Sequence, residues 1–308
     1  MNFNKEQILT VLNSIDFHKI KDHPNILIAA NFWEEERFHA AKICYKYMRA
    51  IDDLIDNHKA NNKVILPEIQ NEFTITIENW LMDIVNSTKH EPLQKELSEI
   101  INVFDIPLWP FQNFAKSMAY DINNDGFTSL HAFLDYSQGA SVAPASIFVH
   151  LCGLTKTDGK YQPPPFDVKQ AATPCAIFSY LVHIIRDFQK DQLSNLNYFA
   201  DDLIAKHGLT RQNLREFAEG KTINSNFRSL MQEYYQLADN YRLDTYDILQ
   251  QINPLLRPRY RLSLEIIFEL YLMVFERIDI KHGSFTSEEL NPTPEEIKDR
   301  VLRTIMKK

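Results

Sequence analysis

The chain has 308 residues and a mass of 36.1 kDa, and 44% of its residues are hydrophobic, which is sufficient for a sizeable core. The formal net charge of −8 argues against a nucleic-acid partner, because nucleic-acid binders carry basic patches. Only 7 glycines stand against 14 prolines, whereas sheet-rich and Rossmann-type proteins need more glycine at turns and phosphate loops. The composition therefore predicts a mostly helical protein.

Helical periodicity recurs along most of the chain. It predicts helices over residues 4–15, 35–57, 68–85, 92–104, 109–122, 128–153, 168–192, 210–218, 223–250 and 257–280. Turn-forming residues separate some of them, at 123–129, 155–167 and 253–258. A Thr-Pro-Glu-Glu sequence starting at Thr293 predicts a terminal helix. Because no repeat or domain-scale linker interrupts this pattern, we expect an all-α protein with a single domain over residues 1–308.

The N-terminus, the apolar runs and the cysteines indicate where the protein resides. The sequence MNFNKEQILTVLNSID is amphipathic and charged, unlike a signal peptide, and the longest apolar runs are too short to span a bilayer. Cys44, Cys152 and Cys175 form an odd set without metal-ligand spacing, which is typical of buried thiols in a reducing compartment. We therefore expect a cytoplasmic protein, and the sequence leaves its oligomeric state open.

Two short acidic motifs each follow an apolar segment. In YMRAIDDLID, Asp52, Asp53 and Asp56 form a candidate divalent-metal site, and in RDFQKD, Asp187 and Asp191 repeat the four-residue spacing. On a helix this spacing places both carboxylates of a pair on one face. The apolar segments before the motifs are typical of helices at the centre of a bundle. The acidic ends would then lie at the rim of an apolar interior.

Cationic residues accompany both acidic motifs. Lys46 and Arg49 precede the first motif, and Arg186 and Lys190 adjoin the aspartates of the second. Carboxylates that bind Mg²⁺, next to Arg and Lys side chains that hold phosphate oxygens, suit a diphosphate ligand. The alternative interpretation is a pair of solvated helix faces whose acidic residues form ordinary ion pairs, in a purely structural helical bundle.

Four segments resemble the squalene/phytoene synthase family, and together they cover about residues 20 to 280. CYKYMRAIDDLID resembles the first aspartate-rich motif of the family, and IIRDFQKDQLSNLNYFADDLIAKHGLT resembles the second. DYSQGASVAPASIFVHLCG resembles the helix between the motifs, and LSLEIIFELYLMVFERID resembles the C-terminal core helix. The resemblance implies an all-α, single-domain isoprenoid synthase helical bundle around a central cavity.

The resemblance also implies an activity, a metal and a set of site residues. The family joins two prenyl diphosphates head-to-head through a cyclopropyl diphosphate, with Mg²⁺, or Mn²⁺ in its place, between the two acidic motifs. Candidate metal ligands are Asp52, Asp53, Asp56, Asp187 and Asp191. Candidate diphosphate-binding residues are Arg49, Arg186 and Lys190. Tyr45, Tyr136 and Tyr271 match tyrosines that line the reaction cavity of the family.

The chain departs from the common family pattern at three positions near the second motif: His183 replaces an Asn, Tyr180 a Gln and Leu196 an Arg. His183 lies four residues before Asp187 and would face the same way on a helix. Three roles remain open for it: a core histidine bonded to a carbonyl, a metal ligand that favours Mn²⁺ or Co²⁺, or a proton acceptor with a pKa near neutrality.

The substrate and the extent of the reaction remain open. The leading interpretation is condensation of two farnesyl diphosphates to presqualene diphosphate or squalene, and NADPH would be needed for squalene. The alternatives are phytoene synthase-type condensation of geranylgeranyl diphosphate and a catalytically altered homologue that only binds prenyl diphosphates. Because such substrates and products partition into lipid, we expect transient contact with membranes.

Overall fold

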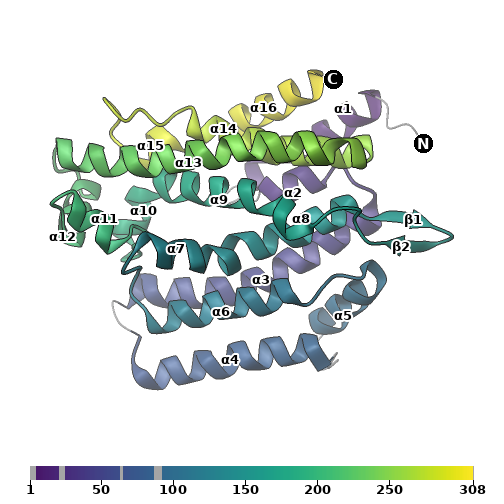
Figure 1. Cartoon of the computed structure of the whole chain (residues 1–308), viewed down its shortest axis with the longest axis horizontal. Coiled ribbons are helices and arrows are strands. Elements are labelled where there is room, and N and C mark those ends of the chain that lie inside the picture. The colour runs from purple at the N-terminus through teal and green to yellow at the C-terminus, as the bar shows by residue number, and fades with distance from the viewer. Residues whose placement is uncertain (1–4, 21–24, 63–64, 87–91, 308) are drawn as a thin grey trace.

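The computed structural model describes residues 5–20, 25–62, 65–86 and 92–307, which form a helical protein with one short β-hairpin (Figure 1). The helices are α1 (Lys5–Ser14), α2 (Asn25–Ala30), α3 (Glu35–Asn61), α4 (Pro67–Asn86), α5 (Pro92–Phe104), α6 (Trp109–Asn123), α7 (Leu130–Ser137), α8 (Ala143–Gly153), α9 (Val168–Arg186), α10 (Phe188–Leu193), α11 (Asp201–Lys206), α12 (Arg211–Ala218), α13 (Ser225–Ile252), α14 (Pro258–Phe275), α15 (Ser287–Leu290) and α16 (Pro294–Met306). The hairpin consists of β1 (Thr155–Thr157) and β2 (Lys160–Gln162), which pair antiparallel.

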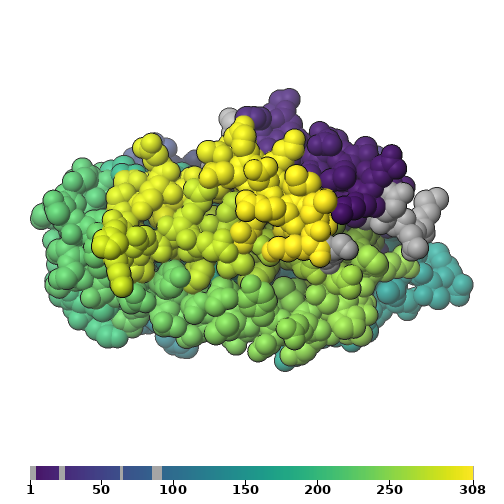
Figure 2. All heavy atoms as spheres, turned by 90° about the horizontal axis from the view of Figure 1, so that it is seen from above, coloured from purple at the N-terminus to yellow at the C-terminus, as the bar shows by residue number. Residues whose placement is uncertain are grey.

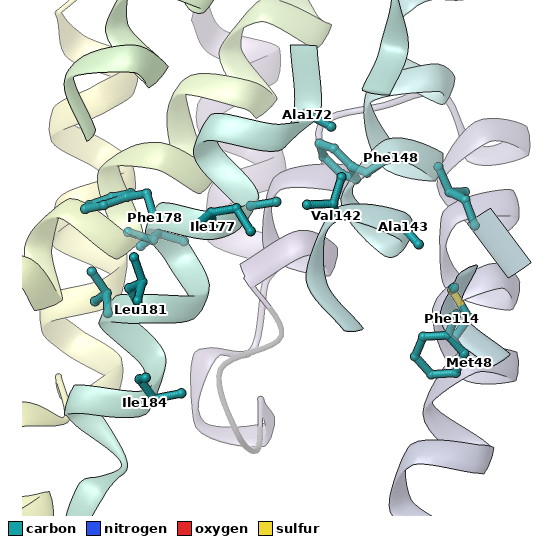
Figure 3. Close-up of a cluster of buried hydrophobic side chains, with 14 of the residues drawn as sticks. Met48, Phe114, Val142, Ala143, Phe148, Ala172, Ile177, Phe178, Leu181 and Ile184 are labelled. Atoms are coloured by element: carbon teal, nitrogen blue, oxygen red, sulfur yellow. The ribbon is translucent and has the colours of Figure 1, made fainter. Parts of the chain in front are cut away.

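The long helices are stacked in layers, and α9 lies at the centre of the stack. Figure 1 shows α4 at one edge, followed by α3 and α6, then by α7, α8 and α9, and finally by α13, α14 and α16 at the opposite edge. The packing between α9 and α13 is the most extensive between any two described elements, and α9 also contacts α8 and α14. Ile177, Phe178 and Leu181 on α9 are almost fully buried, as Figure 3 shows. The apolar character of this segment thus places it inside the bundle.

The N-terminal and C-terminal helices pack against each other on the outside of this core. Figure 2 shows α1 beside the C-terminal segments that cover this face of the molecule, and α16 contacts both α1 and α14. A capping box starts α16, in which the Thr293 hydroxyl accepts from the Glu296 amide and the Glu296 carboxylate accepts from the Thr293 amide. The sequence signal at Thr293 therefore predicts this helix correctly.

A π-helical segment, η2 (Gln138–Val142), joins α7 to α8 without interrupting the helical path. Pro144 has no N–H to donate to the preceding turn, which favours the wider π geometry there. At Gly139, an added Cβ would lie 2.1 Å from the Asn113 carbonyl oxygen on α6. Only glycine permits this close approach of η2 to α6, so the segment is held firmly against the bundle.

Several boundaries differ from the predicted ones. The segment 155–167, predicted as a loop, contains the hairpin, whose turn residues Asp158 and Gly159 both have positive φ, as a tight two-residue turn requires. The helix predicted over 168–192 is divided at Asp187, which has φ −92° and ψ 6°. The helix predicted over 257–280 ends at Phe275. The short helices α2, α11 and α15 have too few residues for periodicity to predict them.

Candidate functional site

A cavity of about 590 Å³ lies between α3, α8, α9, α13 and α14, and all the candidate site residues line it. These residues are Tyr45, Arg49, Asp52, Asp53, Asp56, Tyr136, His183, Arg186, Asp187, Lys190, Asp191 and Tyr271. Away from the acidic motifs the wall is apolar, with Ile248 and Leu249 from α13 and Leu264 and Ile267 from α14. The fold therefore brings both acidic motifs to one cavity that also offers a hydrocarbon-like surface.

The first acidic motif lies on the uninterrupted helix α3. The Nη1 atom of Arg49 is 2.7 Å from Oδ2 of Asp52, and Nη2 of the same guanidinium bonds to Asp53. Burial raises the pKa of Asp52 to about 6, although Arg49 opposes the rise. Within the described residues, the Asp56 carboxylate has no hydrogen bond or ion pair. Burial and the negative charge of Asp52 raise the pKa of Asp56 well above its usual value.

The second acidic motif lies where α9 meets α10. The Arg186 guanidinium donates from Nε to Oδ1 of Asp187 at 2.7 Å and from Nη2 to Oδ2 at 2.9 Å. The Nε2 atom of His183 is 2.8 Å from the same Oδ2. Burial alone would raise the pKa of Asp187, but His183 and Arg186 outweigh it and hold that pKa far below the usual range. Burial and the Asp187 charge raise the pKa of Asp191 to about 8.

The donor chemistry of these two motifs fits a magnesium ion. Carboxylate oxygens are the protein ligands that Mg²⁺ prefers, and a cation would stabilise the charged forms of Asp56 and Asp191, which burial disfavours. In the part of the chain that the structure describes, no three His, Cys, Asp or Glu side chains converge as one metal site. Any metal here would therefore complete its coordination shell with water or ligand oxygens, as Mg²⁺ commonly does with phosphates.

Aromatic side chains form the cavity wall beside the first motif. Tyr180 stacks on Phe133 with centroids 5.4 Å apart and on Tyr136 at 6.4 Å, and its edge meets Tyr198 at 6.2 Å. Burial and nearby carboxylates, Asp121 first among them, raise the pKa of the Tyr136 hydroxyl well above its usual value. Burial also raises the pKa values of the Tyr180 and Tyr198 hydroxyls, so all three hydroxyls stay protonated near neutral pH and the wall offers uncharged π surfaces.

The structure adds two residues that the sequence does not single out. These residues are Asp121 on α6 and Lys59 on α3. The Asp121 carboxylate accepts a hydrogen bond from the Tyr136 hydroxyl and forms an ion pair with Lys59, whose Nζ lies 3.1 Å from Oδ1. Asp121 also raises the pKa values of Asp52 and Asp56. Asp121 has no acidic partner at helical spacing within α6, so no sequence motif marks it.

Comparison with known proteins identifies the family. A family model described as squalene/phytoene synthase matches residues 21–293. The chain belongs to the squalene/phytoene synthase family. It is 23% identical over 209 residues to phytoene synthase 2, chloroplastic, of Solanum lycopersicum, and 22% identical over 218 residues to phytoene synthase, chloroplastic, of Narcissus pseudonarcissus. Each match covers 67% of this chain but only 62% and 46% of those two proteins.

Three solved structures share the fold of this synthase family member. A dehydrosqualene synthase in complex with ligand superposes with a TM-score of 0.66 at 16% identity, covering 97% of this chain and 99% of that one. YisP from Bacillus subtilis gives 0.63 at 16% identity, covering 97% and 96%. Squalene synthase HpnC from Alicyclobacillus acidocaldarius gives 0.58 at 10% identity, covering 80% and 96%. The predicted all-α isoprenoid synthase fold is thereby confirmed.

The departures from the family pattern all lie at the cavity. His183, Tyr180 and Leu196 all line it. Of the cysteines, Cys44 and Cys152 are buried free thiols as expected, whereas Cys175 is partly exposed. None of the helices in the described ranges is long and apolar enough to cross a membrane.

Proposed function

We propose that this chain catalyses the Mg²⁺-dependent head-to-head condensation of two farnesyl diphosphates to presqualene diphosphate or squalene. One observation carries the proposal: both acidic motifs line a single cavity whose remaining walls are apolar. A prenyl diphosphate has the same two parts, a polyanionic head that needs cations and a hydrocarbon tail that needs an apolar surface. Membership of the squalene/phytoene synthase family supports this activity.

The acidic motifs and their neighbouring cations would bind the diphosphate groups. In this proposal Mg²⁺ is held by Asp52, Asp53, Asp56, Asp187 and Asp191. When bound, the metal supplies positive charge that stabilises a departing diphosphate. Arg49, Arg186 and Lys190 would donate hydrogen bonds to the phosphate oxygens, which strengthens the same stabilisation in a site shielded from water.

The aromatic and apolar walls would protect the carbocation that forms when a prenyl diphosphate ionises. Tyr45, Tyr136 and Tyr271 line the cavity from three different helices. Their rings attract a cation through the negative face of the π system, and the apolar wall excludes water that would quench it. The proposal requires no covalent nucleophile.

A side chamber adjoins the main cavity at the first acidic motif. A side chamber of about 160 Å³ shares Arg49 and Asp52 with the main cavity and runs between α3, α6 and α8. Its wall includes Met48 and Phe114, which Figure 3 shows on the α3 side of the core, and Leu151. These side chains are almost fully buried, and the chamber would hold part of a prenyl tail. We propose farnesyl diphosphate as the substrate, and the product analysis below distinguishes it from geranylgeranyl diphosphate.

Two other functions remain in the proposal as alternatives. Phytoene synthase-type condensation of geranylgeranyl diphosphate is favoured by the names of the curated relatives. A homologue that binds prenyl diphosphates without condensing them is favoured by the departures at His183, Tyr180 and Leu196. In every case we propose that residues 1–308 act as one domain, located in the cytoplasm. We also propose that the protein contacts membranes only transiently. High salt without detergent should therefore release it from sedimented membranes.

Product analysis tests the proposal and separates its alternatives. The purified protein is incubated with Mg²⁺ and either farnesyl or geranylgeranyl diphosphate, with and without NADPH, and the products are identified by mass spectrometry. We expect a C30 product from farnesyl diphosphate, reduced to squalene only if NADPH is used. A C40 product from geranylgeranyl diphosphate alone would favour the phytoene-type reaction. Binding of both diphosphates without any condensation product would contradict the proposed activity.

A further inference from the structure

His183 differs from a core histidine in its surroundings. The imidazole of His150, by comparison, is buried and has its Nε2 atom 3.0 Å from the Phe104 carbonyl oxygen. The side chain of His183 is 41% exposed, lines the cavity and has its Nε2 atom beside a carboxylate oxygen of Asp187. His183 therefore bonds to a carboxylate and not to a carbonyl, which was one of the roles left open for it, and its side chain faces the cavity where a ligand can reach it.

The helix geometry holds His183 and Asp187 in register. The Asp187 amide donates to the His183 carbonyl oxygen at 2.9 Å, and the Asp191 amide donates to the Asp187 carbonyl oxygen at 2.8 Å. The three side chains are therefore each one turn apart, even though α9 ends at Arg186. A His and an acidic residue at i and i+4 on one face can bind the same ion, as histidine pairs at this spacing do.

The two candidate ligand atoms lie close together in the cavity. His183 Nε2 and Asp187 Oδ2 are 2.8 Å apart. Neighbouring corners of an octahedron with bonds of about 2.1 Å lie about 3.0 Å apart. In the present hydrogen bond Nε2 points directly at Oδ2, so the imidazole must turn and its Nε2 proton must pass to solvent before one cation can bind both atoms. The His183 side chain is 41% exposed, which leaves room for that turn.

The hydrogen bonds around Asp187 leave room for such a cation. A carboxylate has about four lone-pair sites. Arg186 occupies one on each oxygen, and His183 occupies the second site on Oδ2. Replacing the His183 proton by a metal ion would leave both bonds from Arg186 in place. The guanidinium opposes the metal electrostatically, so a cation needs further negative charge, which Asp191 and a diphosphate would supply.

We infer that His183 and Asp187 form a mixed nitrogen–oxygen metal ligand pair that favours Mn²⁺ or Co²⁺ over Mg²⁺. The inference rests on the proposed function, because it places the ion at the second acidic motif. Imidazole is a good ligand for transition metals, whereas Mg²⁺ strongly prefers oxygen. Within the described residues no third His, Cys, Asp or Glu converges with the pair. Diphosphate oxygens would complete the shell, so the ion should bind tightly only when diphosphate is present.

Electron paramagnetic resonance with Mn²⁺ and inorganic pyrophosphate tests the inference without requiring catalysis. Electron spin echo modulation should show a directly bound ¹⁴N nucleus in the wild-type protein, replaced by ¹⁵N modulation in ¹⁵N-labelled protein. His183→Asn should remove this signal and lower the affinity for Mn²⁺ relative to Mg²⁺ by about tenfold, as measured by competition.

A matched control is present on α7. His131 Nε2 lies 3.3 Å from Asp135 Oδ2, also at i and i+4, but both side chains are exposed outside the cavity. His131→Asn should leave the nitrogen signal and the metal preference unchanged. Mn²⁺ bound without nitrogen modulation, or an unchanged metal preference in His183→Asn, would overturn this inference alone. Absence of pyrophosphate-dependent Mn²⁺ binding in the wild type would overturn both the inference and the proposed function.

Discussion

The two acidic motifs line the same cavity but differ in how their charges are balanced. On α3, Arg49 bonds to both Asp52 and Asp53, and the helix continues past them without a break. At the junction of α9 and α10, Arg186 and His183 both bond to Asp187. In each motif the later aspartate, Asp56 or Asp191, has no ion pair within the described residues and an elevated pKa.

The difference between paired and unpaired aspartates indicates which carboxylates need a bound cation to be stable in their charged form. The aspartates that are already paired are held in place by the protein itself, so they orient the site before any ion arrives. Burial favours the protonated, neutral form of the unpaired aspartates, and an added cation would stabilise their charged form. The site is therefore partly assembled, and we expect metal and diphosphate to complete it from both sides of the cavity.

The largest expected effect is loss of turnover when either motif is changed. Asp52→Asn and Asp187→Asn should each lower Mg²⁺-dependent turnover by on the order of 100-fold, because each removes negative charge that holds the metal against the diphosphate. The folded state should persist, which thermal melting would verify. Asp135→Asn is the control, because Asp135 is exposed and lies outside the cavity.

Near-normal turnover in either cavity variant would contradict the assignment of that motif. Loss of turnover in only one of the two variants would show that catalysis depends on one motif alone. The structural difference between the two motifs would then have no counterpart in catalysis.

The helices with strong periodicity could be predicted from the sequence almost to their ends. The predicted ranges 92–104 and 109–122 match α5 (Pro92–Phe104) and α6 (Trp109–Asn123), because each segment carries a continuous apolar face. The hairpin was predictable from the Asp158-Gly159 turn, since that pair suits two residues with positive φ. The break in the helix at Asp187 was not predictable from the sequence, because local hydrogen bonds keep the helical spacing across it.

The candidate site could be predicted where its residues recur at helical spacing. All the candidate residues reach the cavity because two matching aspartate motifs follow apolar helices. Asp121 and Lys59 could not be predicted, because their contact joins the last turns of α6 and α3 and depends on how these helices pack. The spacing of four residues places His183 and Asp187 on one helix face, but it did not decide between a bond to this carboxylate and the other roles left open for His183.

The second largest effect concerns stability of the metal-free protein. The folded-state pKa of Asp191 is about 8, above its unfolded value of about 4, so the folded state binds more protons between these pH values and loses stability as pH rises through them. Asp191→Asn should therefore stabilise the protein at pH 8 by about 2 kcal/mol, after allowance for partial solvent screening. Urea unfolding in EDTA at pH 5 and pH 8 measures this.

Asp187→Asn provides the opposite case in the same motif. Its folded-state pKa is lowered, so its ion pairs stabilise the protein above the unfolded pKa, and that contribution is lost as pH falls through the folded-state pKa. The substitution should therefore destabilise the protein at pH 8. Equal shifts for Asp187→Asn and Asp191→Asn at pH 8 would refute the distinction between paired and unpaired aspartates.

A smaller effect is expected at the Tyr136 hydroxyl. Tyr136→Phe removes its hydrogen bond to Asp121 and should lower kcat by about tenfold, because the ring loses the contact that orients it at the cavity wall. Asp121→Asn should have a similar effect, and the double variant should be no worse than the more severe single variant. Steady-state kinetics of all three proteins measures this, and fully additive losses would show that the two residues act separately.

The smallest expected effect is at a single cation of the second motif. Lys190→Met should raise KM about threefold with little change in kcat, because one charge–phosphate contact is lost equally from bound substrate and transition state. Lys46→Met is the control on α3, since Lys46 is exposed and does not line the cavity. A tenfold or larger fall in kcat for Lys190→Met would mean that this lysine acts in the chemical step.

Calorimetric titration of the protein with inorganic pyrophosphate tests most directly whether the two motifs act together through metal. We predict binding in the presence of Mg²⁺ that is lost in EDTA, and weakened in Asp56→Asn as strongly as in Asp191→Asn. Binding of equal strength in Mg²⁺ and in EDTA, or weakening by only one of the two substitutions, would contradict a metal–diphosphate site shared by both motifs.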